Sequence, residues 1–189
     1  MKETVKLGII LLVFCLASAG ILSYVNGVTA PIISEREEQN AKEAYQQLIP
    51  EADDFEALDV NELSQLKQQV SKLDSVILAK SAGDTIGYLF TTRGGGYGGD
   101  ISVITAIVDN AVKDITILKM SETPDIGTKV LERSFQEQYV GKITTEPIAV
   151  KKENPGAQDI QAISGSTVSS KGVTDAVNIA LEVSEVLNK

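Results

Sequence analysis

The fold expected for this chain is decided by the stretch Ser75–Met120, SVILAKSAGDTIGYLFTTRGGGYGGDISVITAIVDNAVKDITILKM. It contains four runs rich in β-branched and aromatic residues, a composition typical of strands. These runs are residues 75–80, 84–92, 101–108 and 112–120, and the turns between them are Ser-Ala-Gly at 81–83 and Asp109-Asn110. Because turns this short join neighbouring antiparallel strands, the pattern predicts an antiparallel sheet.

Helices are expected on both sides of this stretch. Ser169–Leu187 has the clearest helical pattern, since apolar residues recur on one face from Val173 onward. Further helices are expected over Ser34–Leu48, Leu63–Val70 and Ile126–Tyr139. Thr29-Ala30-Pro31 is expected to break the chain before the first of these, because proline interrupts a helix. The sequence therefore predicts an α+β fold with an antiparallel sheet flanked by helices.

The N-terminus carries an uncharged, apolar run of 19 residues, Leu7–Val25. As a helix it extends roughly 28 Å, close to the thickness of a bilayer core. Lys2 and Lys6 precede it, which predicts a cytoplasmic N-terminus and an extracytoplasmic remainder. A cleaved signal peptide ending at Ala17-Ser18-Ala19 is the alternative, disfavoured because the apolar run continues past that point. The expected divisions are an anchor over 1–28, a helical stalk over 29–50 and a folded domain over 51–189.

Composition excludes several classes of chemistry. The 189 residues include 26 acids and 17 bases, and the net charge of −9 disfavours nucleic-acid binding. With no histidine, the chain cannot build a Ser-His-Asp triad or a histidine-ligated metal site. One cysteine cannot form an internal disulfide or hold an iron–sulfur cluster by itself. Any chemistry must therefore use oxygen ligands, backbone amides or a borrowed cofactor.

The glycine-rich segment at 94–99, GGGYGG, matches the spacing G-x-G-x-x-G. In a dinucleotide-binding fold that turn opens a helix, whereas here the strand-like run 101–108 follows it. A dinucleotide fold is therefore excluded. The segment is either a flexible strand connection or a place where backbone approaches a ligand closely.

Two later segments contain helix starts that can also hold an anion. In Ser121–Lys129, SETPDIGTK, Thr123 is expected to cap a helix that begins at Pro124. Ser164–Lys171, SGSTVSSK, places five hydroxyls in seven positions before the C-terminal helix. Capping is the favoured interpretation of both segments. Anion binding to free N–H groups is the second, with Lys171 one turn into the last helix.

The order of these features resembles the FMN-binding domain family. The resemblance rests on the N-terminal span, Thr29-Ala30-Pro31, Gly-Tyr-Gly-Gly, Glu-Thr-Pro-x-x-Gly-x-Lys, and Ser-Gly-x-Thr before the last helix. Within the family, the chain is most similar to G subunits of Rnf-type complexes. It departs from the usual motifs in having Ser166 in place of alanine, Asp125-Ile126 in place of Gly-Leu, and Gln161 in place of aspartate.

The resemblance implies one extracytoplasmic FMN-binding domain after a single transmembrane helix. FMN would be attached covalently, through a phosphoester to Thr167, by a separate flavin transferase that uses FAD. Ser164, Gly165 and Ser166 would lie around the phosphate, and Glu122, Thr123, Gly127 and Lys129 belong to the segment near the flavin ring. Tyr97 and Gly98 match the glycine-rich segment. No catalytic residue and no metal site is expected.

The implied function is electron relay in an Rnf-type ferredoxin:NAD oxidoreductase coupled to Na⁺ or H⁺ translocation, in the cell membrane. The chain would carry electrons among other membrane subunits and catalyse nothing independently. One alternative is the C subunit of a sodium-translocating NADH:quinone reductase, which shares the domain and is expected to be longer. Another is a non-redox, membrane-anchored adaptor in which the hydroxyl cluster is only a helix cap.

Overall fold

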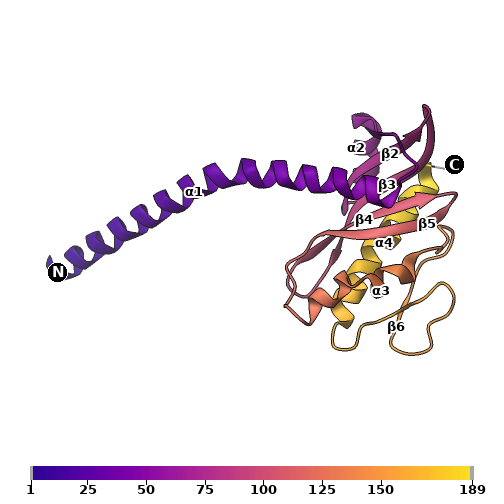
Figure 1. Cartoon of the computed structure of the whole chain (residues 1–189). Helices are drawn as coiled ribbons and strands as arrows, with labels where there is room; N and C mark the ends of the chain where they lie inside the picture. The colour runs from indigo at the N-terminus through magenta and orange to yellow at the C-terminus, as the bar shows by residue number, and fades with distance from the viewer. Residues whose placement is uncertain (1, 188–189) are drawn as a thin grey trace. The chain divides into compact units, whose positions relative to one another are not determined.

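The computed structural model describes residues 2–187, which divide into two compact units, one up to Lys42 and the other from Glu43 onward (Figure 1). The first unit is helical and belongs to α1 (Lys2–Leu48), whose last residues belong to the second unit. The apolar side chains from Val5 to Ile33 are exposed. This helix is long and apolar enough to cross a membrane.

The expected helix break at Thr29-Ala30-Pro31 is wrong, and so is a separate helix start at Ser34. Helix α1 continues through all of these residues with Pro31 in its interior. Proline removes one backbone donor but leaves the hydrogen bonds of the turns on either side. The Thr29 hydroxyl also donates to the Val25 carbonyl over 2.9 Å, which adds a local contact in this part of the helix.

The second unit contains a five-stranded antiparallel sheet, which confirms the predicted architecture. Its strands lie in the order β1 (Asp54–Ala57), β2 (Leu73–Ser81), β3 (Asp84–Gly95), β4 (Asp100–Val108) and β5 (Ala111–Lys119). Strand β1 was not predicted, because its four residues are mostly exposed and lack a strand-like pattern. Both predicted turns have the left-handed backbone that tight hairpins need, at Ala82-Gly83 and at Asp109-Asn110.

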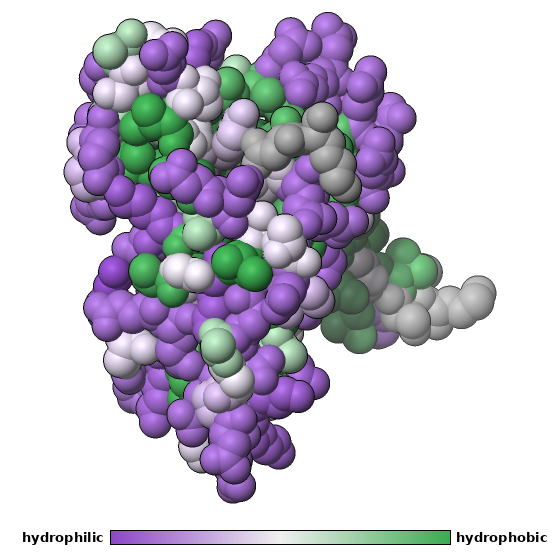
Figure 2. Space-filling model, turned by 90° about the vertical axis from the view of Figure 1, so that its right-hand side faces the viewer, coloured by the Kyte–Doolittle hydropathy of each residue, from purple (hydrophilic) through white to green (hydrophobic). Residues whose placement is uncertain are grey.

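Helices cover one face of the sheet, and the end of α1 with the residue after it packs on the other face. Helix α4 (Thr167–Leu187) lies along one face and buries a row from Val173 to Val183 against β3 and β4 (Figure 1). Helix α2 (Val60–Gln69) adds Leu66 to the same core. Leu48 and Ile49 cover the other face. The outer surface is largely hydrophilic with small, separate apolar patches, as Figure 2 shows for one side.

The segment expected to form one helix over Ile126–Tyr139 is instead three short pieces. These are η1 (Gly127–Leu131), α3 (Arg133–Gln136) and η2 (Glu137–Tyr139). Glu132 has an extended backbone and separates the first two pieces. A two-stranded parallel pair, β6 (Val150–Lys151) with β7 (Ile160–Gln161), leads into α4 and was not predicted.

Two glycines allow the backbone of α4 to pack directly against the backbone at the end of β3. A methyl group added at Gly94 would overlap the Gly172 carbonyl oxygen. A methyl group at Gly172 would lie 2.7 Å from the Gly95 carbonyl oxygen. This contact fixes the N-terminal turns of α4 beside the glycine-rich connection between β3 and β4.

We predict that Gly94→Ala destabilises the folded domain by about 2–3 kcal/mol, because backbone atoms must move to admit the methyl group. Gly95→Ala is the matched control, since a side chain there meets no neighbouring atom. Urea unfolding of both variants measures the difference. Equal stability of the two variants would show that the close crossing does not constrain the domain.

Candidate functional site

A cavity of about 610 Å³ lies at the N-terminus of α4. This volume is within the range of small-molecule sites, roughly 300–1,000 Å³. The cavity draws its walls from the glycine-rich connection, the segment before η1, the loop after β6 and the first turn of α4. Its lining consists of Tyr97, Glu122, Thr123, Ile126, Gly127, Lys152, Gly165, Ser166, Thr167, Val168 and Ser169.

The structure brings together most of the residues that the sequence singled out. Those lining the cavity are Tyr97, Glu122, Thr123, Gly127, Gly165, Ser166 and Thr167. Ser164 and Lys129 are exposed and lie outside the lining, as does Gly98, whose amide instead donates to Glu122. Sequence reasoning missed Ile126, Lys152, Val168 and Ser169. Lys152 comes from a loop with no motif, so only the fold could reveal it.

The hydroxyl residues at the start of α4 have different environments. Thr167, the first residue of the helix, is half-buried and lines the cavity. The Ser170 hydroxyl accepts from the Ile163 amide over 3.1 Å and donates to the Ser166 carbonyl over 2.9 Å. The Ser166 hydroxyl is buried and has no hydrogen-bond partner among the described residues, so it does not cap the helix. The capping interpretation therefore fails for Ser166.

Glu122 ties three segments together at the cavity wall. One carboxylate oxygen accepts from the Gly98 amide over 3.1 Å, and the other accepts from the Ser169 hydroxyl over 2.8 Å. A methyl group added at Gly127 would lie 2.6 Å from the Glu122 β-carbon. The glycine therefore gives the carboxylate side chain room to reach both donors.

The expected helix cap at Thr123 is wrong. Its carbonyl, not its side chain, accepts from the Gly127 amide over 2.9 Å, and the short helix η1 starts only at Gly127. Asp125 has a positive φ of 59°, a conformation that aspartate tolerates better than most residues. Its amide donates to the Thr128 hydroxyl over 2.9 Å. The segment is a tight turn that exposes Thr123 and Ile126 to the cavity.

The cavity has positive groups at the start of α4, and its one lining carboxylate already accepts two hydrogen bonds. The helix α4 has 21 residues, and its free amides give a positive electrostatic end beside Thr167. Lys152 adds a positive side chain to the lining, whereas the Glu122 carboxylate is already engaged by two donors. Tyr97, Ile126 and Val168 are largely exposed apolar groups at the same cavity. The site thus combines an anion-binding end with apolar surface.

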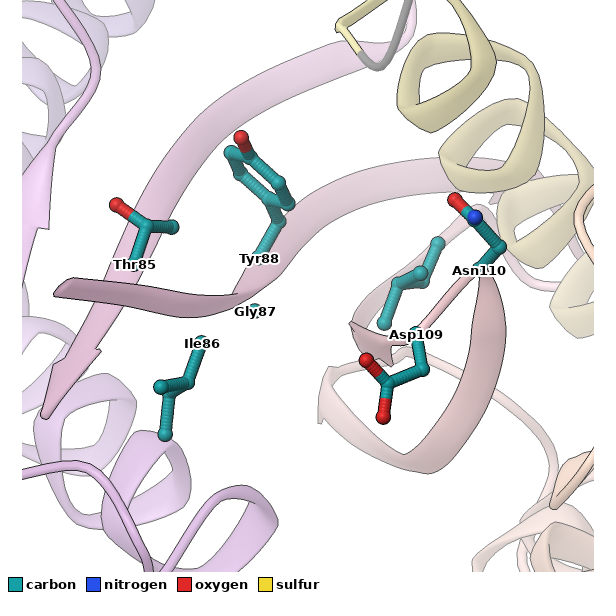
Figure 3. Close-up of a pocket in the computed structure, with 7 residues that line it drawn as sticks. Thr85, Ile86, Gly87, Tyr88, Asp109 and Asn110 are labelled. Carbon is teal, nitrogen blue, oxygen red and sulfur yellow. The ribbon is translucent and has the colours of Figure 1, made fainter.

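A second cavity, of about 280 Å³, lies at the start of β3 beside the turn between β4 and β5. Figure 3 shows Thr85, Ile86 and Tyr88 on the strand and Asp109 and Asn110 on the turn. Its lining contains no positively charged side chain and no helix N-terminus. Asp109 and Asn110 are explained by the left-handed backbone of their turn. The cavity at α4 is therefore the better candidate site.

Comparisons with known proteins show the family to which the chain is similar. Residues 96–182 match the model of the FMN-binding domain, and residues 1–48 match the model of the RnfG N-terminal region. The first match contains every residue that lines the cavity at α4.

The chain is similar over its whole length to the G subunit of a Na(+)-translocating ferredoxin:NAD(+) oxidoreductase complex from Acetobacterium woodii. The two are 36% identical over 197 residues, which cover 100% of this chain and 95% of the relative. The G subunit of a proton-translocating ferredoxin:NAD(+) oxidoreductase complex from Clostridium ljungdahlii is 29% identical, over 91% of this chain and 86% of the relative.

Solved structures show the same fold at lower identity. The C subunit of the Na(+)-translocating NADH-quinone reductase from Parabacteroides distasonis superposes with a TM-score of 0.57 at 18% identity. That match covers 79% of this chain and 92% of the other. The corresponding values for NqrC from Shewanella oneidensis are 0.52 and 15%, over 72% and 82% of the two chains.

We predict that Glu122→Ala speeds hydrogen exchange at the Gly98 amide and lowers the free energy of unfolding by about 2 kcal/mol, because two hydrogen bonds to a charged acceptor are lost. Gly98 is exposed, so Glu122 is the group that protects its amide. Hydrogen-exchange mass spectrometry and urea unfolding measure the two effects. Glu153→Ala, which removes an exposed carboxylate, is the control. Unchanged exchange at Gly98 would contradict the assigned role of Glu122.

Proposed function

Since the chain belongs to the family of G subunits of ion-translocating ferredoxin:NAD(+) oxidoreductase complexes, we propose that it carries electrons on FMN within such a complex. The observation that carries the proposal is the cavity that opens on Thr167 within the FMN-binding domain. Fold likeness to two NqrC structures covers 72% and 79% of this chain, at sequence identities of 15% and 18%. Full-length similarity to G subunits favours that assignment over the C-subunit alternative.

The residues at the cavity fit the phosphate end of FMN. Phosphate binds well at a helix N-terminus, where free amides and the helix dipole both favour an anion. Gly165 has a positive φ of 80° and bears no side chain that would cover these amides. Lys152 supplies a compensating positive charge in the lining. These groups would hold the phosphate, and their arrangement disfavours the adaptor alternative, in which the cluster is only a cap.

The apolar part of the cavity lining suits a planar aromatic ring. Tyr97, Ile126 and Val168 offer apolar surface, and Gly127 keeps the wall open. Thr123 and Glu122 supply polar atoms near that surface. Bound there, FMN would supply the capacity to accept and release electrons, and the chain would set its position and its electrostatic surroundings.

Thr167 is the residue that we propose as the attachment point. Its hydroxyl-bearing side chain lines the cavity and is only half-buried, so a modifying enzyme can reach it. In the proposed reaction, Thr167 Oγ bonds to the flavin phosphorus of FAD as the pyrophosphate bond breaks. AMP leaves, the hydroxyl proton passes to a base, and no electron is transferred. A flavin transferase is therefore a proposed partner, alongside other membrane subunits of the complex.

The same proposal places the folded domain on the outer face of the cell membrane. Helix α1 is long enough to cross a bilayer, and Lys2 and Lys6 lie before its apolar run. Covalent attachment suits that location, because a flavin lost there could not be replaced from the cytosolic pool.

We predict that Thr167→Ala abolishes covalent flavin, because the nucleophilic oxygen is removed, whereas Thr167→Ser retains it. Intact-mass measurement and in-gel flavin fluorescence, after co-expression with a flavin transferase, check the result. Thr145→Ala, which removes an exposed hydroxyl outside the cavity lining, keeps the adduct. A Thr167→Ala chain that still carries covalent flavin would disprove the attachment site.

The membrane orientation predicts which introduced cysteines an impermeant maleimide can reach. In a Cys15→Ala background, Glu146→Cys is labelled from outside intact spheroplasts, because its side chain is exposed on the extracytoplasmic domain. Glu3→Cys, before the apolar run, is labelled only after lysis. The reverse pattern would place the domain in the cytoplasm.

A further inference from the structure

Ser166 presents an unusual chemical situation at the cavity. The residue is 3% exposed, and its hydroxyl has no hydrogen-bond partner among the described residues. A buried, unpaired hydroxyl lowers the stability of a folded protein. Ser166 directly precedes α4 and lines the cavity at the helix N-terminus. A donor without an acceptor therefore belongs to a residue of the cavity wall, directly before the first turn of α4.

The neighbouring hydroxyls are committed to other partners. Ser169 donates to Glu122 over 2.8 Å, so its proton is engaged by a carboxylate. Ser170 donates to the Ser166 carbonyl and accepts from the Ile163 amide. Under the proposed function, Thr167 loses its proton when the ester forms. Among the buried and half-buried hydroxyls of residues 166–170, that of Ser166 is the one whose hydrogen remains for a ligand.

We infer that the Ser166 hydroxyl donates a hydrogen bond to the phosphate that Thr167 carries, and so locks the ester at the start of α4. This inference rests on the proposed function. A phosphodiester offers only acceptor oxygens and a negative charge, and the partner of those oxygens must be a donor. Because Ser166 is screened from water, its bond to a charged oxygen is stronger than one formed in solvent. The side chain acts as a positioning residue.

A hydrogen bond from Ser166 to the phosphate makes the effect of Ser166→Ala depend on whether flavin is attached, which a purely structural role of Ser166 would not. Ser166→Ala removes an unsatisfied donor from the flavin-free chain but removes a charge-assisted hydrogen bond from the flavinylated chain. The substitution is therefore expected to lower the melting temperature of the flavinylated chain. In the flavin-free chain, it is expected to leave the melting temperature unchanged or to raise it. Thr105 provides a matched control, because its hydroxyl is also buried without a partner among the described residues. Thr105 does not line the cavity.

The test compares full-length chains in detergent, produced with and without a flavin transferase. Melting is followed by far-ultraviolet circular dichroism, since the chain has no tryptophan. In the flavinylated chain, Ser166→Ala lowers the melting temperature by about 4 °C. In the flavin-free chain, it leaves the value unchanged or raises it. Thr105→Val produces the same shift in both forms.

A second readout follows the phosphorus atom itself. The ³¹P resonance of the flavin phosphate moves in Ser166→Ala and stays in place in Thr105→Val. Equal melting shifts in both forms for Ser166→Ala, with an unmoved ³¹P resonance, would overturn the inference and leave the proposed function intact. A wild-type chain that takes up no flavin from the transferase would overturn the proposed function, and this inference with it.

Discussion

The contact between the backbones of β3 and α4 is the constraint on which the rest of the domain depends. Gly94 and Gly172 meet at this crossing, and neither has room for a side chain. The crossing holds the first turns of α4 beside the glycine-rich connection, while Val173 to Val183 anchor the helix along the sheet. A helix displaced by one side chain would carry Thr167 away from Tyr97 and Glu122. The cavity is thus a consequence of how closely two backbones approach.

The negative and positive groups at the cavity differ in whether the protein already binds them. Glu122 is held by donors from the glycine-rich connection and from α4, so its charge is directed into the protein wall. The free amides at the start of α4 and the Lys152 side chain are the positive groups at the cavity. The carboxylate that joins the walls therefore does not cancel the positive end of the site. This separation explains how an acidic protein of net charge −9 can offer a place to a phosphate.

Much of the fold follows from local sequence pattern. The four main strands have β-branched runs between short turns, and α4 has a regular apolar face, so both could be predicted. The continuation of α1 through Pro31 could not, because a helix can tolerate one missing donor when its other turns are intact. The predicted cap at Thr123 was wrong because the turn is closed by the Thr123 carbonyl and by the left-handed backbone of Asp125. The site was only partly predictable. Thr167, Glu122 and Gly127 lie in motifs whose order is recognisable, whereas Lys152 reaches the cavity through the short β6–β7 pair, and the environment of the Ser166 hydroxyl depends on packing around α4.

The central claim is that flavin phosphate is bound to Thr167 at the start of α4. Trypsin releases Glu153–Lys171, a peptide that contains Thr167 together with Ser164, Ser166, Ser169 and Ser170. Fragmentation of this peptide from the transferase-treated chain by electron-transfer mass spectrometry measures which hydroxyl carries the adduct. The account predicts that the mass of the flavin phosphate appears in every fragment that includes Thr167 and in none that lacks it. A flavin located on any of the four serines, or on another peptide, would contradict it.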